Sequence, residues 1–405
     1  MNGNKVPSKS TITLSHVDGD LEVGEHATVK TDAPDQKLTV SGTVFFDGRC
    51  TFECSLEAEN LEGEGDITVN GDLVIQDYID IDDGRLTVSG NLTAKKVDVD
   101  KSVEASKDFE AEDIDIGGTL RVKGTSKART IDVGGTFESE GEVKAENIDV
   151  GGSMTVHSKI DAEKVDVGGS AHVNGGRIGK VDVGGSFMST DSLEFETIDV
   201  GGAVKLAKDN VGGDVDVGGS CKVEGDLKFK TLDVGGIAEI TGKGEGENID
   251  VGGRVFVGKE LQLSGKLDVG GRAEVGEQLS AERIDVGGSL KAKKVKASSN
   301  VDVGGSIETM NGTTADTVRI GRRGEVKGPI HAKEVIVEER ARVEDVYADK
   351  IVLEEKAQAR NLYGKNIRLE YKSEVHGEVK YTESLKAEED VHFAKTPQKV
   401  DKLSL

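Results

Sequence analysis

Twelve aspartates are the residues of this chain whose type and spacing could do chemistry. Each begins the tetrapeptide Asp-Val-Gly-Gly or Asp-Ile-Gly-Gly, and successive copies follow one another at an almost constant spacing. A period of about 17 residues with one constant corner predicts a solenoid in which each repeat forms one coil. The twelve are Asp115, Asp132, Asp149, Asp166, Asp182, Asp199, Asp216, Asp233, Asp250, Asp268, Asp285 and Asp302.

Aspartates at one position of successive coils are expected to form an outward column with a spacing of about 4.8 Å. One interpretation is an Asx-type turn, in which each carboxylate accepts hydrogen bonds from the N–H groups of the following Gly-Gly corner. A second is a column of divalent-cation sites, since calcium prefers several oxygen ligands. A third is an acidic face that discourages sideways bundling. Because stacked like charges repel each other, nearby lysines are expected to offset them.

One coil, written from Ile131 to Asn147, shows which elements must position these aspartates. Small or apolar residues fall at coil positions 1 and 3, 7 and 9, and 13 and 15. Such alternating pairs predict short strands with one face inward, separated by turns. Three pairs per coil predict a three-sided parallel β-helix, an all-β solenoid for which right-handed winding is favoured. Gly134 and Gly135 are expected to form a corner that needs positive φ and close stacking.

The same rhythm continues on both sides of the aspartate repeat. Leu38-Thr-Val-Ser-Gly42 recurs as Leu86-Thr-Val-Ser-Gly90 upstream, and Val318-Arg-Ile320 continues the phase downstream. We predict one continuous solenoid of roughly 23 coils, each rising about 4.8 Å. Its predicted parts are a polar N-terminal tail at 1–11, irregular coils at 12–113, regular Asp-Val-Gly-Gly coils at 114–305, further coils at 306–393 and a C-terminal tail at 394–405.

Composition limits the classes of partner and the location. The net charge of −24 argues against nucleic acid or an anionic membrane surface as a direct partner. The polar start, residues 1–10, is not followed by the apolar region of a signal peptide. No apolar run approaches the roughly 20 residues of a membrane-spanning helix. We therefore expect a cytoplasmic protein for which direct membrane insertion is not expected.

Three cysteines are too few for a disulfide framework. Cys50, Cys54 and Cys221 are interpreted as small buried hydrophobic residues. The alternative is a Cys50–Cys54 pair or metal site, although the spacing is unusual and matching ligands are absent.

Residue patterns of an enzyme are missing from the sequence. A three-sided solenoid acyltransferase would need coils of strictly constant length and a catalytic histidine, whereas the spacing here varies slightly and the histidines are scattered along the chain. The Gly-Gly pairs precede strands and do not resemble a phosphate-binding loop. We therefore predict no catalytic, metal or cofactor-binding residues, no cofactor and no nucleotide. The histidines, interpreted as surface residues, are His16, His26, His157, His172, His331, His376 and His392.

Two C-terminal coils carry a resemblance to a known family. Residues 324–337 are Gly-Glu-Val-Lys-Gly-Pro-Ile-His-Ala-Lys-Glu-Val-Ile-Val, and residues 341–353 are Ala-Arg-Val-Glu-Asp-Val-Tyr-Ala-Asp-Lys-Ile-Val-Leu. This pattern, Val-x-Gly-x-Ile-x-Ala-x-x-Val-x-Val, resembles that of bactofilins, the polymer-forming cytoskeletal proteins. The resemblance covers most of the chain as a rhythm and is most specific in residues 318–393. The chain would be an extended member, and its Asp-Val-Gly-Gly repeat is not a hallmark of the family.

The resemblance implies a right-handed three-sided β-helix that polymerises without nucleotide, through its terminal coils, into non-polar filaments. The residues also point to the ends, because a solenoid has open strand edges there unless something covers them. We therefore predict a structural scaffold that assembles end to end with further copies of itself. The alternative is a non-polymerising acidic binding module for a protein or a divalent cation. The candidate interface residues are Ile12, Leu14, Leu21, Val23, Leu385, Val391 and Phe393.

Overall fold

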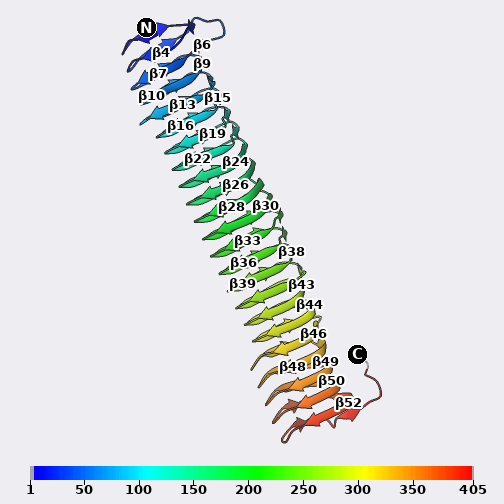
Figure 1. Ribbon diagram of the computed structural model, residues 1–405. Helices are drawn as coiled ribbons and strands as arrows, with labels where there is room; N and C mark the ends of the chain where they lie inside the picture. Colours follow the sequence, from blue (N-terminus) through cyan, green and yellow to red (C-terminus); the bar gives the residue numbers. More distant parts are fainter. Residues whose placement is uncertain (1–3, 404–405) are drawn as a thin grey trace. The chain divides into compact units, whose positions relative to one another are not determined.

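The computed structural model describes residues 4–403 of the chain. These residues form two compact units, an N-terminal unit (Met1–Gly201) and a C-terminal unit (Gly202–Leu405). Both are built from short parallel β-strands, and no helix occurs among the described residues. Each strand pairs with the equivalent strand of the next coil, so that Asp115 lies opposite Asp132. The predicted all-β parallel solenoid is confirmed (Figure 1).

The coils of the N-terminal unit contribute strands to three parallel sheets. The first sheet contains β1 (Asn4–Val6), β4 (Leu21–Val23), β7 (Thr43–Asp47), β10 (Asn60–Glu64), β13 (Tyr78–Asp82), β16 (Lys96–Val99), β19 (Asp113–Ile116), β22 (Thr130–Val133) and the second halves of β24 (Val143–Val150), β26 (Ile160–Val167), β28 (Gly176–Val183) and β30 (Leu193–Val200). The second contains β2 (Thr11–Thr13), β5 (Thr28–Lys30), β8 (Cys50–Phe52), β11 (Ile67–Val69), β14 (Arg85–Val88), β17 (Ser102–Ala105), β20 (Thr119–Val122), β23 (Thr136–Ser139), β25 (Ser153–Val156), β27 (Ser170–Val173) and β29 (Ser186–Ser189). The third contains β3 (His16–Val17), β6 (Lys37–Val40), β9 (Ser55–Ala58), β12 (Leu73–Ile75), β15 (Leu92–Thr93), β18 (Phe109–Glu110), β21 (Ser126–Lys127) and the first halves of β24, β26, β28 and β30.

The C-terminal unit has the same three sheets, and several of its strands continue through a corner from one sheet to the next. The first sheet contains β33 (Asp214–Val217), β36 (Thr231–Val234), β39 (Asn248–Val251), β42 (Lys266–Val269) and the ends of β43 (Arg272–Val286), β44 (Ser289–Val303), β46 (Thr313–Ile320), β48 (Ile330–Val337), β49 (Arg342–Leu353), β50 (Gln358–Leu369) and β52 (Val379–Ala387). The second contains β31 (Ala203–Ala207), β34 (Ser220–Glu224), β37 (Ile237–Ile240), β40 (Arg254–Val257), the starts of β43, β44, β49 and β50, and β45 (Ser306–Thr309), β47 (Glu325–Lys327), β51 (Glu374–Val375) and β53 (His392–Phe393). The third contains β32 (Asn210–Val211), β35 (Leu227–Lys228), β38 (Gly244–Gly246), β41 (Leu261–Leu263), the middle parts of β43, β44, β49 and β50, the starts of β46, β48 and β52, and β54 (Gln398–Lys399).

Strands extend into both segments that the sequence pattern assigns to tails. β1 pairs with β4 in the N-terminal unit, where Val6 lies opposite Val23. β54 pairs with β52 in the C-terminal unit, where Gln398 lies opposite Lys380. The boundary between the two units, after Gly201, falls inside the Asp-Val-Gly-Gly repeat, where the sequence pattern does not change.

The core of each unit consists of ladders of inward-facing Val, Ile and Leu side chains. Ile131 and Ile148 are in register on the first sheet, and each is 1% exposed. On the second sheet Phe137, which is fully buried, stacks on Met154. Because a strand alternates its side chains between two faces, these inward ladders fix the outward direction of the aspartates between them.

The Gly-Gly corners are glycine because of close stacking and not because of their backbone angles. A Cβ on Gly134 would lie 2.3 Å from the carbonyl oxygen of Gly117, and one on Gly151 would lie 2.4 Å from that of Gly134. Neither Gly134 nor Gly151 has a positive φ. The expected close stacking is therefore confirmed, and the expected positive φ at the doublet is wrong.

Replacing Gly151 by Ala should destabilise the N-terminal unit by about 1–3 kcal/mol, the range for overpacking a tight site. The backbone of the neighbouring coil has to shift to make room for the Cβ. Urea unfolding followed by circular dichroism measures the effect as a lower midpoint. Ser153→Ala is the control, because Ser153 is part-exposed in the same coil; it should change stability by less than about 0.5 kcal/mol. Equal midpoints for Gly151→Ala and the wild type would contradict this account of the corner.

Candidate functional site

Three of the predicted interface residues lie in the last coil of the C-terminal unit. Leu385 of β52 is opposite Ile367, and Phe393 of β53 is opposite Val375. Ile367 and Val375 are 2% and 0% exposed, whereas Leu385, Val391 and Phe393 are all part-exposed. The last coil therefore carries apolar side chains at inward positions that are buried one coil earlier.

The backbone of this coil is also left with open edges. β53 pairs with β51, and β54 pairs with β52, and among residues 4–403 neither strand has a second partner. The N-terminal unit is similar, since β1, β2 and β3 pair only with β4, β5 and β6 in the part of the chain that the structure describes. Unpaired N–H and C=O groups along such an edge are a template for another strand.

The N-terminal candidates occupy two different layers. Ile12 of β2 and Leu14 just after it are part-exposed in the first coil. Leu21 and Val23 are 0% and 3% exposed, because β1 covers them. Sequence reasoning missed β1 because Asn4–Val6 holds only one inward apolar residue, which is too short a pattern to indicate a strand.

A recurring turn connects the first sheet to the second in the terminal coils. Its third residue is left-handed and is not glycine, with a φ of 57° at Lys9 and 60° at Asp390. The N–H of this residue donates to a carbonyl of the following coil, as from Lys9 to Glu25 (2.8 Å) and from Lys356 to Tyr371 (2.9 Å). Sequence reasoning missed this turn. Its signal is a charged residue at the corner position where the middle coils have glycine.

The repeated aspartates form an outward column on the first sheet of each unit. In the N-terminal unit the column also includes two aspartates that lack a following Gly-Gly, which is why sequence reasoning missed them. Its members there are Asp80, Asp98, Asp115, Asp132, Asp149, Asp166, Asp182 and Asp199. The members in the C-terminal unit are Asp216, Asp233, Asp250, Asp268, Asp285 and Asp302, and Arg319 takes the next place.

The interpretation of these aspartates as Asx-type turns is wrong. The corner N–H groups are used by the backbone of the preceding coil, as from Gly134 to the carbonyl of Ile116 (2.9 Å) and from Gly152 to that of Gly135 (3.0 Å). Three of the carboxylates instead pair with lysines two residues earlier in the same strand, which offsets part of the repulsion within the column. Asp166 pairs with Lys164 at 3.3 Å. The other such pairs are Lys96–Asp98 and Lys266–Asp268.

The column does not gather carboxylates around a common point. Among residues 4–403, no three His, Cys, Asp or Glu side chains are arranged to hold a metal ion. Burial and the neighbouring carboxylates Asp115 and Asp149 raise the pKa of Asp132 above its ordinary value. Burial and the neighbouring carboxylates Asp216 and Asp250 raise the pKa of Asp233 in the same way. At these two positions repulsion within the column therefore adds to the effect of burial.

Aromatic rings form a second outward column, on the third sheet of the C-terminal unit. His331 stacks on Tyr347 with ring centroids 4.7 Å apart, and Tyr347 stacks on Tyr363 at 4.8 Å. The Tyr363 hydroxyl donates to Glu378 at 3.2 Å, and the Lys380 ammonium lies 5.8 Å from the Tyr363 ring. The Tyr347 ring lies between the other two rings, so this ladder stabilises adjacent coils.

The cysteines are core residues, as expected. Cys50, Cys54 and Cys221 are free and buried. Burial raises the pKa of the Cys221 thiol to about 12, which leaves it protonated and unreactive at neutral pH.

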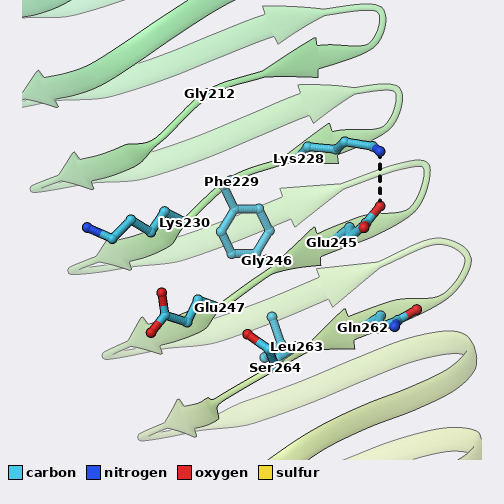
Figure 2. Close-up of a pocket in the computed structure, with 10 residues that line it drawn as sticks. All are labelled: Gly212, Lys228, Phe229, Lys230, Glu245, Gly246, Glu247, Gln262, Leu263 and Ser264. Atoms are coloured by element: carbon cyan, nitrogen blue, oxygen red, sulfur yellow. Dashed lines mark ion pairs between the residues drawn. The ribbon is translucent and has the colours of Figure 1, made fainter.

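A hollow of about 460 Å³ opens on the third sheet of the C-terminal unit, and Gly212 and Gly246 are among the residues that line it (Figure 2). The Phe229 ring occupies the space above Gly246, where a Cβ would lie 2.3 Å from the ring. Phe229 is only 6% exposed. Both lysines that line the hollow are paired, Lys228 with Glu245 at 3.3 Å and Lys230 with Asp214 at 3.7 Å. The hollow therefore offers a ligand little apolar surface and no unpaired lysine.

Comparisons with known proteins identify no relative of this chain. No protein-family model, curated protein or solved structure matches it. Within residues 4–403 there is no helix with the length and apolar character needed to cross a membrane.

Replacing Asp132 by Asn should stabilise the N-terminal unit at pH 7, by about 0.2–1 kcal/mol and near the lower limit because the site is solvated. The folded-state pKa of Asp132 is raised, so its contribution to stability is fully present below the unfolded pKa and is lost as pH rises. The gain from Asp132→Asn should therefore vanish below about pH 4. Thermal unfolding from pH 3 to pH 8 measures it, with Asp161→Asn, outside the column, as the control. A gain that persists in acid would contradict this assignment.

The wild type should lose stability at alkaline pH as Tyr363 ionises, and replacing Tyr363 by Phe should remove this loss. Desolvation and Glu378 raise the pKa of Tyr363 from 10.0 to about 12. The protonated phenol therefore stabilises the folded state fully below pH 10, and that contribution is lost between pH 10 and 12. The difference in unfolding midpoint between wild type and Tyr363→Phe, measured from pH 8 to pH 12, should narrow across this range. A constant difference would show that Tyr363 titrates at its ordinary pKa.

Proposed function

We propose that this chain is a structural cytoskeletal scaffold that assembles end to end with copies of itself through its terminal coils, without nucleotide and in the cytoplasm. The observation that carries the proposal is the difference between the last two coils. Leu385 and Phe393 are part-exposed at positions where their partners Ile367 and Val375 are buried. One further coil from a second copy would complete this layer.

The energetic gain from such a contact comes from two sources. Burying an apolar side chain of this size stabilises by up to about 1.5–3 kcal/mol, and the last coil offers Leu385, Val391 and Phe393 together. Pairing the open edges of β53 and β54 adds backbone hydrogen bonds of about 0.5–1.5 kcal/mol each. Because every strand edge that finds a partner adds to the binding free energy, a partner with the same three-sheet cross-section fits best.

The turn shared by both ends favours contact between the C-terminal coil of one copy and the N-terminal coil of the next. In this arrangement the Asp390 N–H would donate to the carbonyl of Ser8, as that of Lys9 does to Glu25. Lys9 and Asp390 then stack with opposite charges. All strand pairing stays parallel, as it is in both units. Such a heterologous contact repeats without closing and produces a polymer.

This proposal agrees with the resemblance to bactofilins in its end-to-end, nucleotide-independent assembly. It differs in the direction of the subunits, because a head-to-tail polymer is polar whereas the resemblance implies non-polar filaments. The matched turns at Lys9 and Asp390 are the reason for this difference.

Replacing Phe393 by Arg should prevent assembly, because a charge would be buried without a partner in the contact. Electron microscopy and sedimentation of the purified chain should show polymers for the wild type and an association at least about tenfold weaker for Phe393→Arg, which corresponds to about 1.4 kcal/mol. Phe256→Arg is the control, because Phe256 points outward from the second sheet and is part-exposed. Monodisperse wild-type particles at high concentration would refute the proposal.

A mixing experiment determines the direction of assembly. Ile12→Arg blocks the N-terminal coil and Phe393→Arg blocks the C-terminal coil. With head-to-tail contacts, each variant alone should remain single, and an equal mixture should form pairs that grow no further. With contacts between two C-terminal coils, Ile12→Arg alone should form pairs.

A further inference from the structure

The C-terminal unit has a hollow of about 400 Å³ whose surroundings differ from those of the Phe229 hollow. Its floor is apolar and consists of Val275 and Ala292. Met310 lies at its rim with 79% of its surface exposed, and Lys293 and Lys327 line the same opening. The strands that form it are β43, β44, β45 and β47. An apolar floor beside an exposed methionine provides contact area for a side chain from outside.

Two of the three lysines that line this opening, Lys293 and Lys327, are not neutralised, whereas the third, Lys291, is paired. Lys294 and Lys296 do not line the hollow but follow Lys293 along β44 onto the third sheet. None of Lys293, Lys294, Lys296 and Lys327 forms an ion pair with the residues that the structure describes. The acidic side chains that line the opening are already engaged. Glu308 pairs with Lys291 at 3.5 Å, and Glu274 pairs with Arg254 and Arg272. We call the hollow with Lys293, Lys294, Lys296, Lys327 and Met310 the lysine hollow.

The N-terminal unit carries a surface of opposite character on its first sheet. Phe45 of β7 points outward and is 39% exposed. Glu62, which lies opposite Phe45, and Glu64 belong to β10, and Asp80 and Asp82 continue the same two columns on β13. We call these five residues the Phe45 patch.

The four carboxylates of the Phe45 patch resemble the lysines of the lysine hollow in lacking ion-pair partners among the described residues. None of the four forms an ion pair within the described part of the chain, and Glu62 accepts a hydrogen bond from the Tyr78 hydroxyl. They surround a hollow of about 290 Å³ beside the Phe45 ring. The patch therefore presents one aromatic ring beside four negative charges, whereas the lysine hollow presents an apolar floor beside positive charges.

We propose that the lysine hollow binds the Phe45 patch of a second copy of this chain. The Phe45 ring enters the hollow against Val275, Ala292 and Met310, while the carboxylates around it meet the lysines. The two surfaces are opposite in charge, and each contributes apolar area to the contact. The contact uses the sides of the units, so it is separate from end-to-end assembly through the terminal coils and does not depend on it.

Charge determines both the choice of occupant and the conditions of binding. The chain has a net charge of −24, which repels a second copy at long range just as it repels nucleic acid or an anionic lipid surface. A second copy offers an aromatic ring with carboxylates beside it, which complements an apolar floor with lysines beside it. At about 0.15 M salt the Debye length is about 8 Å, so the net repulsion is screened while charges in contact still attract. Self-association is therefore strongest at intermediate salt and weakens at both low salt and about 1 M.

The test measures side-to-side association in full-length chains that also carry Phe393→Arg, so that end-to-end assembly is blocked. Sedimentation velocity across a salt series should show the intermediate maximum. K293E/K294E/K296E should weaken the association at least about tenfold, through loss of charge pairing at the contact. The control K228E/K230E/K243E changes the net charge equally, at lysines that are already paired with Glu245, Asp214 and Glu260. It should associate much as the parent does.

A charge swap identifies the opposite surface. E64K/D80K/D82K reverses the Phe45 patch and should also abolish association when alone. A mixture of this variant with K293E/K294E/K296E should associate again, because each copy then meets an opposite charge at both surfaces. This rescue also shows that both variants are folded.

A disulfide test locates the apolar contact. A mixture of Phe45→Cys and Met310→Cys chains should form a disulfide-linked pair under mild oxidation, since the three native cysteines are buried. Failure of the charge swap to restore association would overturn the proposal. Binding of the parent chain to anionic phospholipid vesicles or to an oligonucleotide, lost in K293E/K294E/K296E and without self-association, would also overturn it and assign the hollow to that partner.

Discussion

The structure depends on one constraint, the close stacking of each coil on the coil before it. This stacking recurs in coil after coil at the Gly-Gly corners, where a Cβ on Gly134 would lie 2.3 Å from the carbonyl oxygen of Gly117. With this contact fixed, the strands of successive coils stay in register, and equal positions form columns along the unit. The repeat therefore places residues of the same type above one another in successive coils.

Stacking identical side chains in successive coils raises or lowers stability, depending on the kind of side chain. Apolar columns gain from it, because Ile131 on Ile148 excludes water from both side chains. Aromatic columns gain as well, as in Tyr347 on Tyr363. Carboxylate columns lose, because burial and then repulsion from Asp115 and Asp149 raise the pKa of Asp132. Lysines beside the aspartates offset part of that cost, and the inward ladders between them supply the rest of the stability.

The features that repeat could be predicted from the sequence, because a period and an alternation report directly on register and on the inward face. The fold class, the corner stacking and the burial of Cys221 follow from such patterns. Hydrogen-bond partners did not follow. The Asx-type turn is wrong because the N–H groups it needed, such as that of Gly134, are taken by the backbone of the neighbouring coil, and a sequence does not show which of two acceptors prevails.

Features that occur once could not be predicted, since they depend on the coils above and below. Met310 is 79% exposed just after β45, beside Lys293 and Lys327. Phe45 is exposed because it occupies an outward place where its column otherwise holds acidic residues such as Glu22 and Glu62. An interior coil has both neighbours and satisfies its edges and its apolar residues by repetition. The terminal coils, the Phe45 patch and the lysine hollow are places where the repetition is interrupted and where groups are left without such partners. In a protein built from one repeated contact, these interruptions are the places where binding energy for a partner is available.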